Sequence, residues 1–206
     1  SLWRSAGDLN VPRTGHAATL LANDEVFVAG GSDSIGITAS AEIYDSVLGT
    51  WRVAANMSGP RSYHSTTRLL NGWVLLVGGQ DLNGVPVASA ELYDPTQNQW
   101  NPAGAMTVTR VSHTATLLPT GHILVAGGRD SAGPSDTAEL YDPGTGLWSL
   151  TGNLNIARAG HSATLLPTTG HILVVGGRNN TGPIDSAELY DPGTGLWSLT
   201  GNLNIA

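Results

Sequence analysis

An arginine and a histidine recur together four times along this chain, separated by two residues each time. The arginines are Arg13, Arg61, Arg110 and Arg158, and the histidines are His16, His64, His113 and His161. Guanidinium groups bind carboxylates and phosphates through paired hydrogen bonds, and neutral imidazole is a common metal ligand. If the four copies surround one axis, the arginines could bind an anion there and the histidines could bind a metal.

Both residue types also have a structural interpretation, because each recurs in every copy. A glutamate recurs with them, as Glu42, Glu91, Glu139 and Glu188. Each arginine could pair with this glutamate or cap carbonyls nearby, and each histidine could bond to neighbouring groups. This structural interpretation is the stronger one, and we expect no metal and no cofactor. The arginines and histidines, with Tyr63 beside them, nonetheless form the candidate ligand-binding set.

The chain offers little that could support catalysis. It has no cysteine, so thiol nucleophiles, disulfides and cysteine metal sites are excluded. We find no Ser-His-Asp spacing, no phosphate-binding loop and no carboxylate pair outside the recurring segments. We therefore expect a protein that is not an enzyme.

Charge and hydrophobicity restrict the partners. The net charge is −7 and all nine basic residues are arginine, with no basic run. Nucleic acid and anionic membranes are therefore not expected as partners. No apolar run approaches the roughly 20 residues of a membrane helix.

The elements that position the arginines and histidines belong to an internal repeat. The histidines are spaced by 48, 49 and 48 residues, and a Gly-Gly pair and a tryptophan recur with the same period. Each repeat predicts a short strand after the histidine, an unbroken apolar strand ending at Gly-Gly, a strand Ala-Glu-x-Tyr-Asp, and a strand at the tryptophan. Such sheets must stack face to face to be covered, which predicts the four-stranded antiparallel blades of an all-β propeller.

The pattern Arg-x-x-His, Gly-Gly, Ala-Glu-x-Tyr-Asp and Trp resembles the kelch repeat, in its bacterial type, and a galactose-oxidase-like propeller without the copper site. The resemblance implies one propeller domain over residues 1–206, with repeats at about 11–58, 59–107, 108–155 and 156–204 and an extra outer strand at 1–10. It also implies an inner position for the first strand of each repeat. Kelch-like proteins include scaffolds, substrate adaptors and copper oxidases. The oxidase chemistry needs a cysteine, which this chain lacks.

In kelch substrate adaptors, arginines at the matching place bind acidic peptides. The resemblance therefore assigns that role to Arg13, Arg61, Arg110 and Arg158.

We also expect a secreted or cell-surface bacterial location in preference to a cytoplasmic one.

The tryptophan strands outnumber the other strands by one, because Trp3 to Trp197 give five of them for four repeats. Two arrangements are compatible with this count. The chain could close into a four-bladed ring with a spare end strand, or it could form part of a larger ring that another chain completes. Near-identical repeats favour exchange between chains, so a homo-oligomer formed by blade or strand complementation is a further expectation.

Residues 121–157 and 170–206 are almost the same sequence and differ at six positions. Five of these positions lie between the Gly-Gly pair and Ala-Glu, in the loop that joins the second and third strands. Loops on a rigid scaffold commonly carry binding sites. We therefore predict a binding or scaffold module for a protein or acidic peptide, with its site formed by the arginines and the loops 32–38, 80–87, 129–136 and 178–185. The alternatives are an extracellular glycan-binding protein and a propeller fragment that assembles with other chains and has no defined ligand.

Overall fold

The computed structural model describes residues 6–204 and contains four four-stranded antiparallel sheets, here called blades 1 to 4 in chain order. This confirms the predicted all-β class and the four-stranded blades. Blade 1 contains β1 (Ala17–Leu20), β2 (Val26–Ala29), β3 (Ala41–Asp45) and β4 (Thr50–Ala54). Blade 2 contains β5 (Ser65–Arg68), β6 (Val74–Val77), β7 (Ser89–Asp94) and β8 (Gln99–Ala105).

The second half of the chain repeats this plan. Blade 3 contains β9 (Thr114–Leu117), β10 (Ile123–Ala126), β11 (Ala138–Asp142) and β12 (Leu147–Leu150). Blade 4 contains β13 (Ser162–Leu165), β14 (Ile172–Val175), β17 (Ala187–Asp191) and β18 (Leu196–Leu199). A small hairpin of β15 (Arg178–Asn179) and β16 (Gly182–Pro183) extends the loop between β14 and β17.

Within each blade the strands pair in chain order, and the tyrosine of the third strand lies opposite the tryptophan of the fourth. The ring centroids of these pairs are 4.9–5.1 Å apart. The tryptophan then reaches the blade before it: Trp148 Nε1 donates to the Ala103 carbonyl at 2.9 Å. These aromatic pairs therefore join each outer strand to its own sheet, and in blades 2, 3 and 4 the tryptophan also joins it to the preceding blade.

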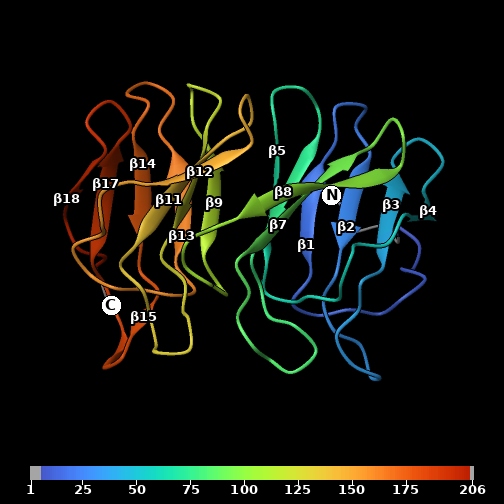
Figure 1. Ribbon diagram of the computed structural model, residues 1–206, viewed down its shortest axis with the longest axis horizontal. Coiled ribbons are helices and arrows are strands. Elements are labelled where there is room, and N and C mark those ends of the chain that lie inside the picture. Colours follow the sequence, from blue (N-terminus) through green and yellow to red (C-terminus); the bar gives the residue numbers. More distant parts are fainter. Residues whose placement is uncertain (1–5, 205–206) are drawn as a thin grey trace.

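The blades are arranged as an open arc (Figure 1). The first strands contact one another in sequence, β1 with β5, β5 with β9 and β9 with β13. Three hydrophobic clusters fill the three spaces between consecutive blades. Among the described residues, β13 and β1 make no comparable contact, and Figure 1 shows blades 1 and 4 at opposite ends. The chain therefore does not close into a four-bladed ring.

The last tryptophan strand, β18, completes blade 4. The extra outer strand predicted at residues 1–10 lies partly outside the described residues, and residues 6–10 form no strand. None of the described residues forms a helix that could cross a membrane.

The second strands of the blades differ in burial according to their position in the arc. All four residues of β6 and of β10 are buried, as expected for an apolar strand covered on both faces. In β14 buried and partly exposed residues alternate, with Leu173 and Val175 partly exposed. Among the described residues no further blade packs against blade 4, so one face of this strand is uncovered.

Candidate functional site

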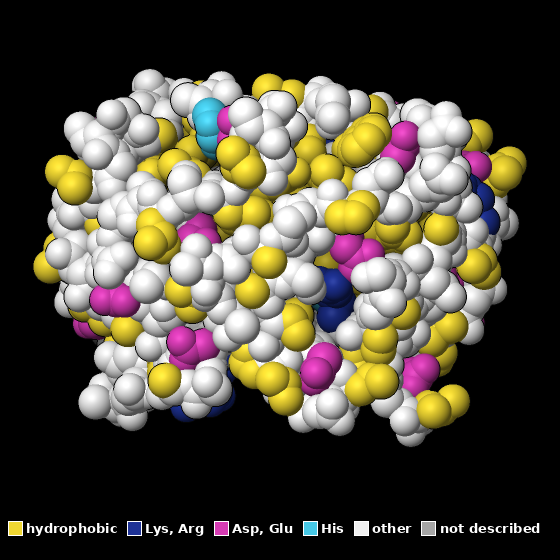
Figure 2. All heavy atoms as spheres, viewed as in Figure 1, with side chains coloured by type: hydrophobic (Ala, Val, Ile, Leu, Met, Phe, Trp, Pro, Cys, Tyr) yellow, Lys and Arg dark blue, Asp and Glu magenta, His cyan; other side chains and the backbone are white. Residues whose placement is uncertain are grey.

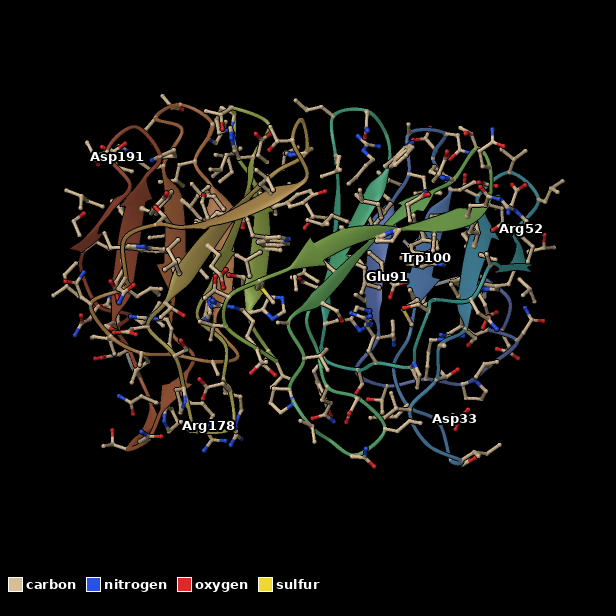
Figure 3. The ribbon with its side chains drawn as sticks, viewed as in Figure 1. Asp33, Arg52, Glu91, Trp100, Arg178 and Asp191 are labelled. Carbon is tan, nitrogen blue, oxygen red and sulfur yellow. The ribbon has the colours of Figure 1, made fainter. Side chains whose placement is uncertain are left out.

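One edge of the arc, to which all four blades contribute, contains both sets of segments that the sequence predicts for the site. Isolated bridges join each Arg-x-x-His segment to the residue after Gly-Gly: Thr14 with Ser32, Ser62 with Gln80, Val111 with Arg129 and Ala159 with Arg178. Figure 3 shows Asp33 and Arg178 at this edge, which is the lower one in the view. We call it the mouth face; it consists of residues 13–16, 61–64, 110–113 and 158–161 and the loops 32–38, 80–87, 129–136 and 178–185.

Each arginine of the repeat is enclosed within its own blade. The exposed fraction is 0% for Arg110 and Arg158 and 4% for Arg61, and the Arg13 side chain is also fully buried. Each guanidinium forms an ion pair with the glutamate of its own repeat: Arg13–Glu42 at 2.7 Å, Arg61–Glu91 at 2.6 Å, Arg110–Glu139 at 2.8 Å and Arg158–Glu188 at 2.8 Å.

The remaining bonds make one network of the recurring residues. Arg110 Nη1 donates to the carbonyls of Gly127, at 2.8 Å, and Thr137, at 2.9 Å. The carboxylate of Glu139 also accepts the backbone N–H groups of Thr107 and Val108. The arginine, the Gly-Gly pair and the glutamate therefore recur together because they hold one another in place.

This geometry corrects the prediction of an exposed ring of arginines. A buried guanidinium is costly unless a carboxylate and hydrogen-bond acceptors surround it, and each of these four has both. Burial lowers the pKa of Arg61 and of Arg110, and the attraction of Glu91 and Glu139 opposes that shift. These side chains serve the scaffold, as the structural interpretation expected, and their guanidinium groups are turned to partners inside the blades.

Three of the four histidines are packed between blades. His113 Nε2 lies 2.8 Å from Ser65 Oγ of blade 2, and His161 Nε2 lies 3.0 Å from Thr114 Oγ1 of blade 3. Burial lowers the pKa of His64 and His113 to about 3 and that of His161 to about 4, so all three are neutral at neutral pH. His16 is exposed, because none of the other described blades packs against its side of blade 1.

The histidines therefore contact the preceding blade, one at each interface. The described part of the chain contains no group of three or more His, Cys, Asp or Glu that could hold a metal ion.

Tyr63 belongs to a backbone ladder at the inner rim. Its N–H donates to the Gly15 carbonyl at 2.8 Å, its carbonyl accepts from Ser112 N–H at 3.0 Å, and the Ser112 carbonyl accepts from Gly160 N–H at 2.9 Å. All four residues have φ between 53° and 64°. This left-handed region is strained for tyrosine and serine. The Tyr63 side chain is 47% exposed, so it remains available to a ligand.

Apolar side chains project from the mouth face of blades 1 and 2. Ile35 is 95% exposed, Leu82 64% and Val85 52%. Ile35 and Leu82 line one hollow of about 420 Å³, and Leu82 and Pro60 also line a neighbouring hollow of about 300 Å³. Figure 2 shows hydrophobic side chains along the lower edge of this half of the molecule.

The exposed cations of the mouth face are Arg129 and Arg178, which the sequence interpretation missed. Each directly follows a Gly-Gly pair, where the first two repeats have Ser32 and Gln80. Neither forms an ion pair within residues 6–204. Their loops are neighbours, since a Cβ placed on Gly133 would lie 3.1 Å from Asn180 Oδ1. A charged residue at a position that varies among repeats was the available signal.

A further hollow of about 830 Å³ lies beside the outer strand of blade 2, away from the mouth face. Trp100, Asn56, Gln99 and Asn101 line it together with Glu91. Figure 3 shows Glu91 and Trp100 on the same side of the molecule.

These observations define an arc of a β-propeller, built from four blades that each contain an Arg–Gly–Glu network of the same kind. A family model described as the kelch motif matches residues 12–58, 60–107, 110–155 and 157–204. These four matches cover nearly the whole chain, so the protein belongs to the kelch family.

A similar solved structure is a fungal alcohol oxidase of the AA5 family in complex with copper, with a TM-score of 0.59 and 20% sequence identity. The similarity covers 94% of this chain and 54% of that one, so this chain spans about half the length of the oxidase. At this identity the similarity concerns the fold alone. A search of curated protein sequences found no significant match.

Proposed function

We propose that this kelch arc is a non-catalytic binding or scaffold module that holds a protein segment at its mouth face. The observation that carries the proposal is the duplicated pair of repeats. Residues 121–157 and 170–206 preserve the scaffold, and four of their six differences, at positions 130, 131, 132 and 135 of the first copy, fall in the loops of this face. A surface whose loops vary on a constant framework is suited to recognition.

The exposed groups indicate the chemistry of the ligand. Ile35 and Leu82 offer apolar area beside a hollow in blades 1 and 2, and Arg129 and Arg178 offer unpaired positive charge in blades 3 and 4. A peptide with a large apolar side chain and nearby carboxylates would match both. The acidic-peptide ligand thus remains the proposal, but different arginines bind it.

The test is a selection from a random linear peptide library displayed on phage, followed by calorimetry with the selected peptide. We expect acidic and apolar residues in the selected sequences. Ile35→Ser with Leu82→Ser should weaken binding at least about tenfold, and Arg129→Gln with Arg178→Gln should reduce affinity and its salt dependence.

Leu70→Ser is the matched control, because Leu70 is 77% exposed and lies on the turn between β5 and β6. Selected peptides that bind the control and both mouth-face variants equally would show that the site lies elsewhere.

Glycan binding is a second candidate, favoured by the hollow beside Trp100. An aromatic ring with amide side chains is suited to stacking on a sugar and bonding to its hydroxyls. A glycan array with the unmodified chain tests it, and a hit should lose affinity in Asn101→Ala and keep it in the mouth-face variants. Asn101 is chosen because it lines the hollow and none of its side-chain atoms forms a hydrogen bond within the described residues.

A further inference from the structure

Blade 1 and blade 4 each have one sheet face that no other blade covers. On blade 4, Leu203 is 49% exposed, although the equivalent residues of the preceding repeats, Leu154, Met106 and Met57, are 3–4% exposed. On blade 1, Leu20 is 54% exposed, and Tyr44 is partly exposed although the equivalent tyrosines of the later blades are 0–1% exposed. At the two ends of the arc, Leu203 and Tyr44 are therefore more exposed than their buried equivalents at the inner interfaces. Leu20 is more exposed than Leu117 and Leu165, its partly buried equivalents in blades 3 and 4.

The three inner interfaces share the same hydrogen bonds. At each one, the N–H of the second glycine donates to the carbonyl of the next repeat's arginine: Gly31 to Arg61 at 2.9 Å, Gly79 to Arg110 at 2.9 Å and Gly128 to Arg158 at 2.8 Å. Each interface also contains one step of the backbone ladder that runs from Gly15 to Gly160. Two of the three add a histidine bonded to a serine or threonine.

The two ends of the arc hold the two halves of one more set of these bonds. Blade 4 presents the N–H of Gly177, the carbonyl of Gly160 and the exposed hydroxyl of Ser162. Blade 1 presents the carbonyl of Arg13, the N–H of Gly15 and the exposed imidazole of His16. Within residues 6–204 these six groups form no hydrogen bond of the kind found at the inner interfaces.

The first glycine of each Gly-Gly pair also shows that blade 4 lacks the cover that the inner blades have. A Cβ on Gly127 would lie 2.7 Å from the Arg158 carbonyl oxygen and 2.7 Å from His161 Cε1, so blade 4 closely covers this position. On Gly176, the equivalent in blade 4, the nearest atoms are 3.6 Å away and belong to Ile184 and Leu203. The space that a following histidine would fill is open.

We propose that the uncovered face of blade 4 binds blade 1 of a second copy of this chain. His16 of the second copy bonds to Ser162, its Arg13 carbonyl accepts from Gly177, and its Gly15 donates to the Gly160 carbonyl. Leu20 and Leu203 become buried in this contact. The occupant is a second copy because blade 1 of this same chain exposes every group that the blade 4 face lacks.

This contact is head to tail, since it joins two different surfaces. Two chains related by a twofold axis form it twice, and the eight resulting blades close a ring within the range known for propellers. The contact borders the mouth face, to which Gly15, His16 and Gly160 belong, but it uses none of Ile35, Leu82, Arg129 and Arg178. This inference therefore does not depend on the side chains of the proposed peptide site. Closure would place the mouth-face loops of both copies around one axis.

The first experiment measures the mass of the chain by light scattering and by sedimentation equilibrium over a range of concentrations. We expect a dimer with twice the 21.3 kDa of one chain. Leu20→Asp and Leu203→Asp should each weaken the dimer at least about 100-fold, because each places an unpaired charge in both contacts. Leu147→Asp is the control, since Leu147 is 68% exposed on the outer strand of blade 3. Circular dichroism confirms that each variant is folded.

Mixing the two variants then tests the head-to-tail arrangement. A pair of one Leu20→Asp chain and one Leu203→Asp chain retains one unaltered contact, so the mixture should dimerise where each variant alone does not. His16→Ala with Ser162→Ala gives a milder test that leaves charge and packing intact, with a dimer about tenfold weaker.

A chain that remains at 21.3 kDa at every concentration would overturn the proposal. So would a dimer that Leu203→Asp disrupts and Leu20→Asp does not, because such a dimer would join two copies of the blade 4 face. If the chain forms the dimer but binds no peptide, the proposed function is wrong and the proposed dimer contact stands.

Discussion

Residues 138–157 and 187–206 have the same sequence of 20 residues, yet the equivalent positions occupy different environments. Leu154 is 3% exposed and packs between blades 3 and 4, whereas Leu203 is 49% exposed at the end of the arc. The local structure is the same in both copies, with tyrosine opposite tryptophan and an Arg–Glu pair beside them. Burial here is thus set by the neighbouring blade and not by the sequence of the segment.

The largest effects should come from the networks that are equally buried in both copies. Glu139→Ala and Glu188→Ala each leave a buried arginine without its partner, and each should lower the free energy of unfolding by about 3–5 kcal/mol. Urea denaturation measures both. Glu25→Ala, which removes the exposed pair with Arg52, should cost less than about 1 kcal/mol. A cost for Glu188→Ala near that of Glu25→Ala would show that the last blade is not held as the third one is.

The next prediction concerns the two leucines directly. Leu154→Ala should cost about 2–5 kcal/mol, because it opens a cavity in the core between blades 3 and 4. Leu203→Ala should cost less than about 1 kcal/mol in dilute solution, since no blade covers it. If Leu203→Ala becomes costlier as protein concentration rises, the open face is covered by a second copy. Equal costs for both variants at low concentration would contradict the open arc.

The glycines Gly127 and Gly176 give a matched pair with less structural disturbance. Their φ angles are 60° and 64°, so alanine is strained to the same degree at both. At Gly127 the new methyl group would also meet the Arg158 carbonyl and His161, whereas Gly176 has space. Gly127→Ala should therefore cost about 1–3 kcal/mol more than Gly176→Ala. Thermal unfolding measured on both variants checks this difference, and its absence would mean that Gly176 is covered.

The histidines buried at the inner interfaces should make the free energy of unfolding depend on pH. Burial lowers the pKa of His161 to about 4 in the folded chain, below its ordinary value of 6.5. The stability that depends on a neutral His161 is fully present above about pH 6.5. It falls as the pH decreases toward about 4, because His161 of the unfolded chain gains a proton at a higher pH than His161 of the folded chain. Denaturation between about pH 7 and about pH 5 should show a shallower slope in His161→Gln. An unchanged slope would contradict the buried, neutral histidine; His122→Gln, in a surface turn, is the control.

The smallest effect should come from the interface between blades 1 and 2. Ala17 stands where Ser65 and Thr114 bond to the histidine of the next blade, and within residues 6–204 neither ring nitrogen of His64 has a hydrogen-bond partner. Ala17→Ser should supply that partner and raise the free energy of unfolding by about 1 kcal/mol. Ala18→Ser, at the exposed neighbouring position, should leave it unchanged. A stability of Ala17→Ser no greater than that of Ala18→Ser would contradict the assigned contact.

Much of the fold could be predicted from the sequence, because each blade repeats the same pattern over about 49 residues. The unbroken apolar run of β6 predicts a strand covered on both faces, and the structure buries all four of its residues. The pairing of Arg110 with Glu139 could also be predicted, because an arginine and a glutamate recur together in every repeat. The exposed ring of arginines was wrong because recurrence in every repeat indicates a scaffold role more strongly than a site.

The mouth face was less accessible to sequence reasoning. Arg129 and Arg178 occupy a position where other repeats have Ser32 and Gln80, so no repeating pattern marks them. Their exposure depends on the bridges that hold each loop against an Arg-x-x-His segment, and these bridges join residues distant in the sequence.

The sequence by itself determined the repeat, the four strands of each blade and the residues that hold them, since these follow from short-range patterns and local pairing. Only the tertiary structure decided whether the arc closes, which arginines reach solvent, and why one of two identical leucines is buried. The physical reason is that a blade buries its faces against other blades, so exposure depends on the number and curvature of the blades around it.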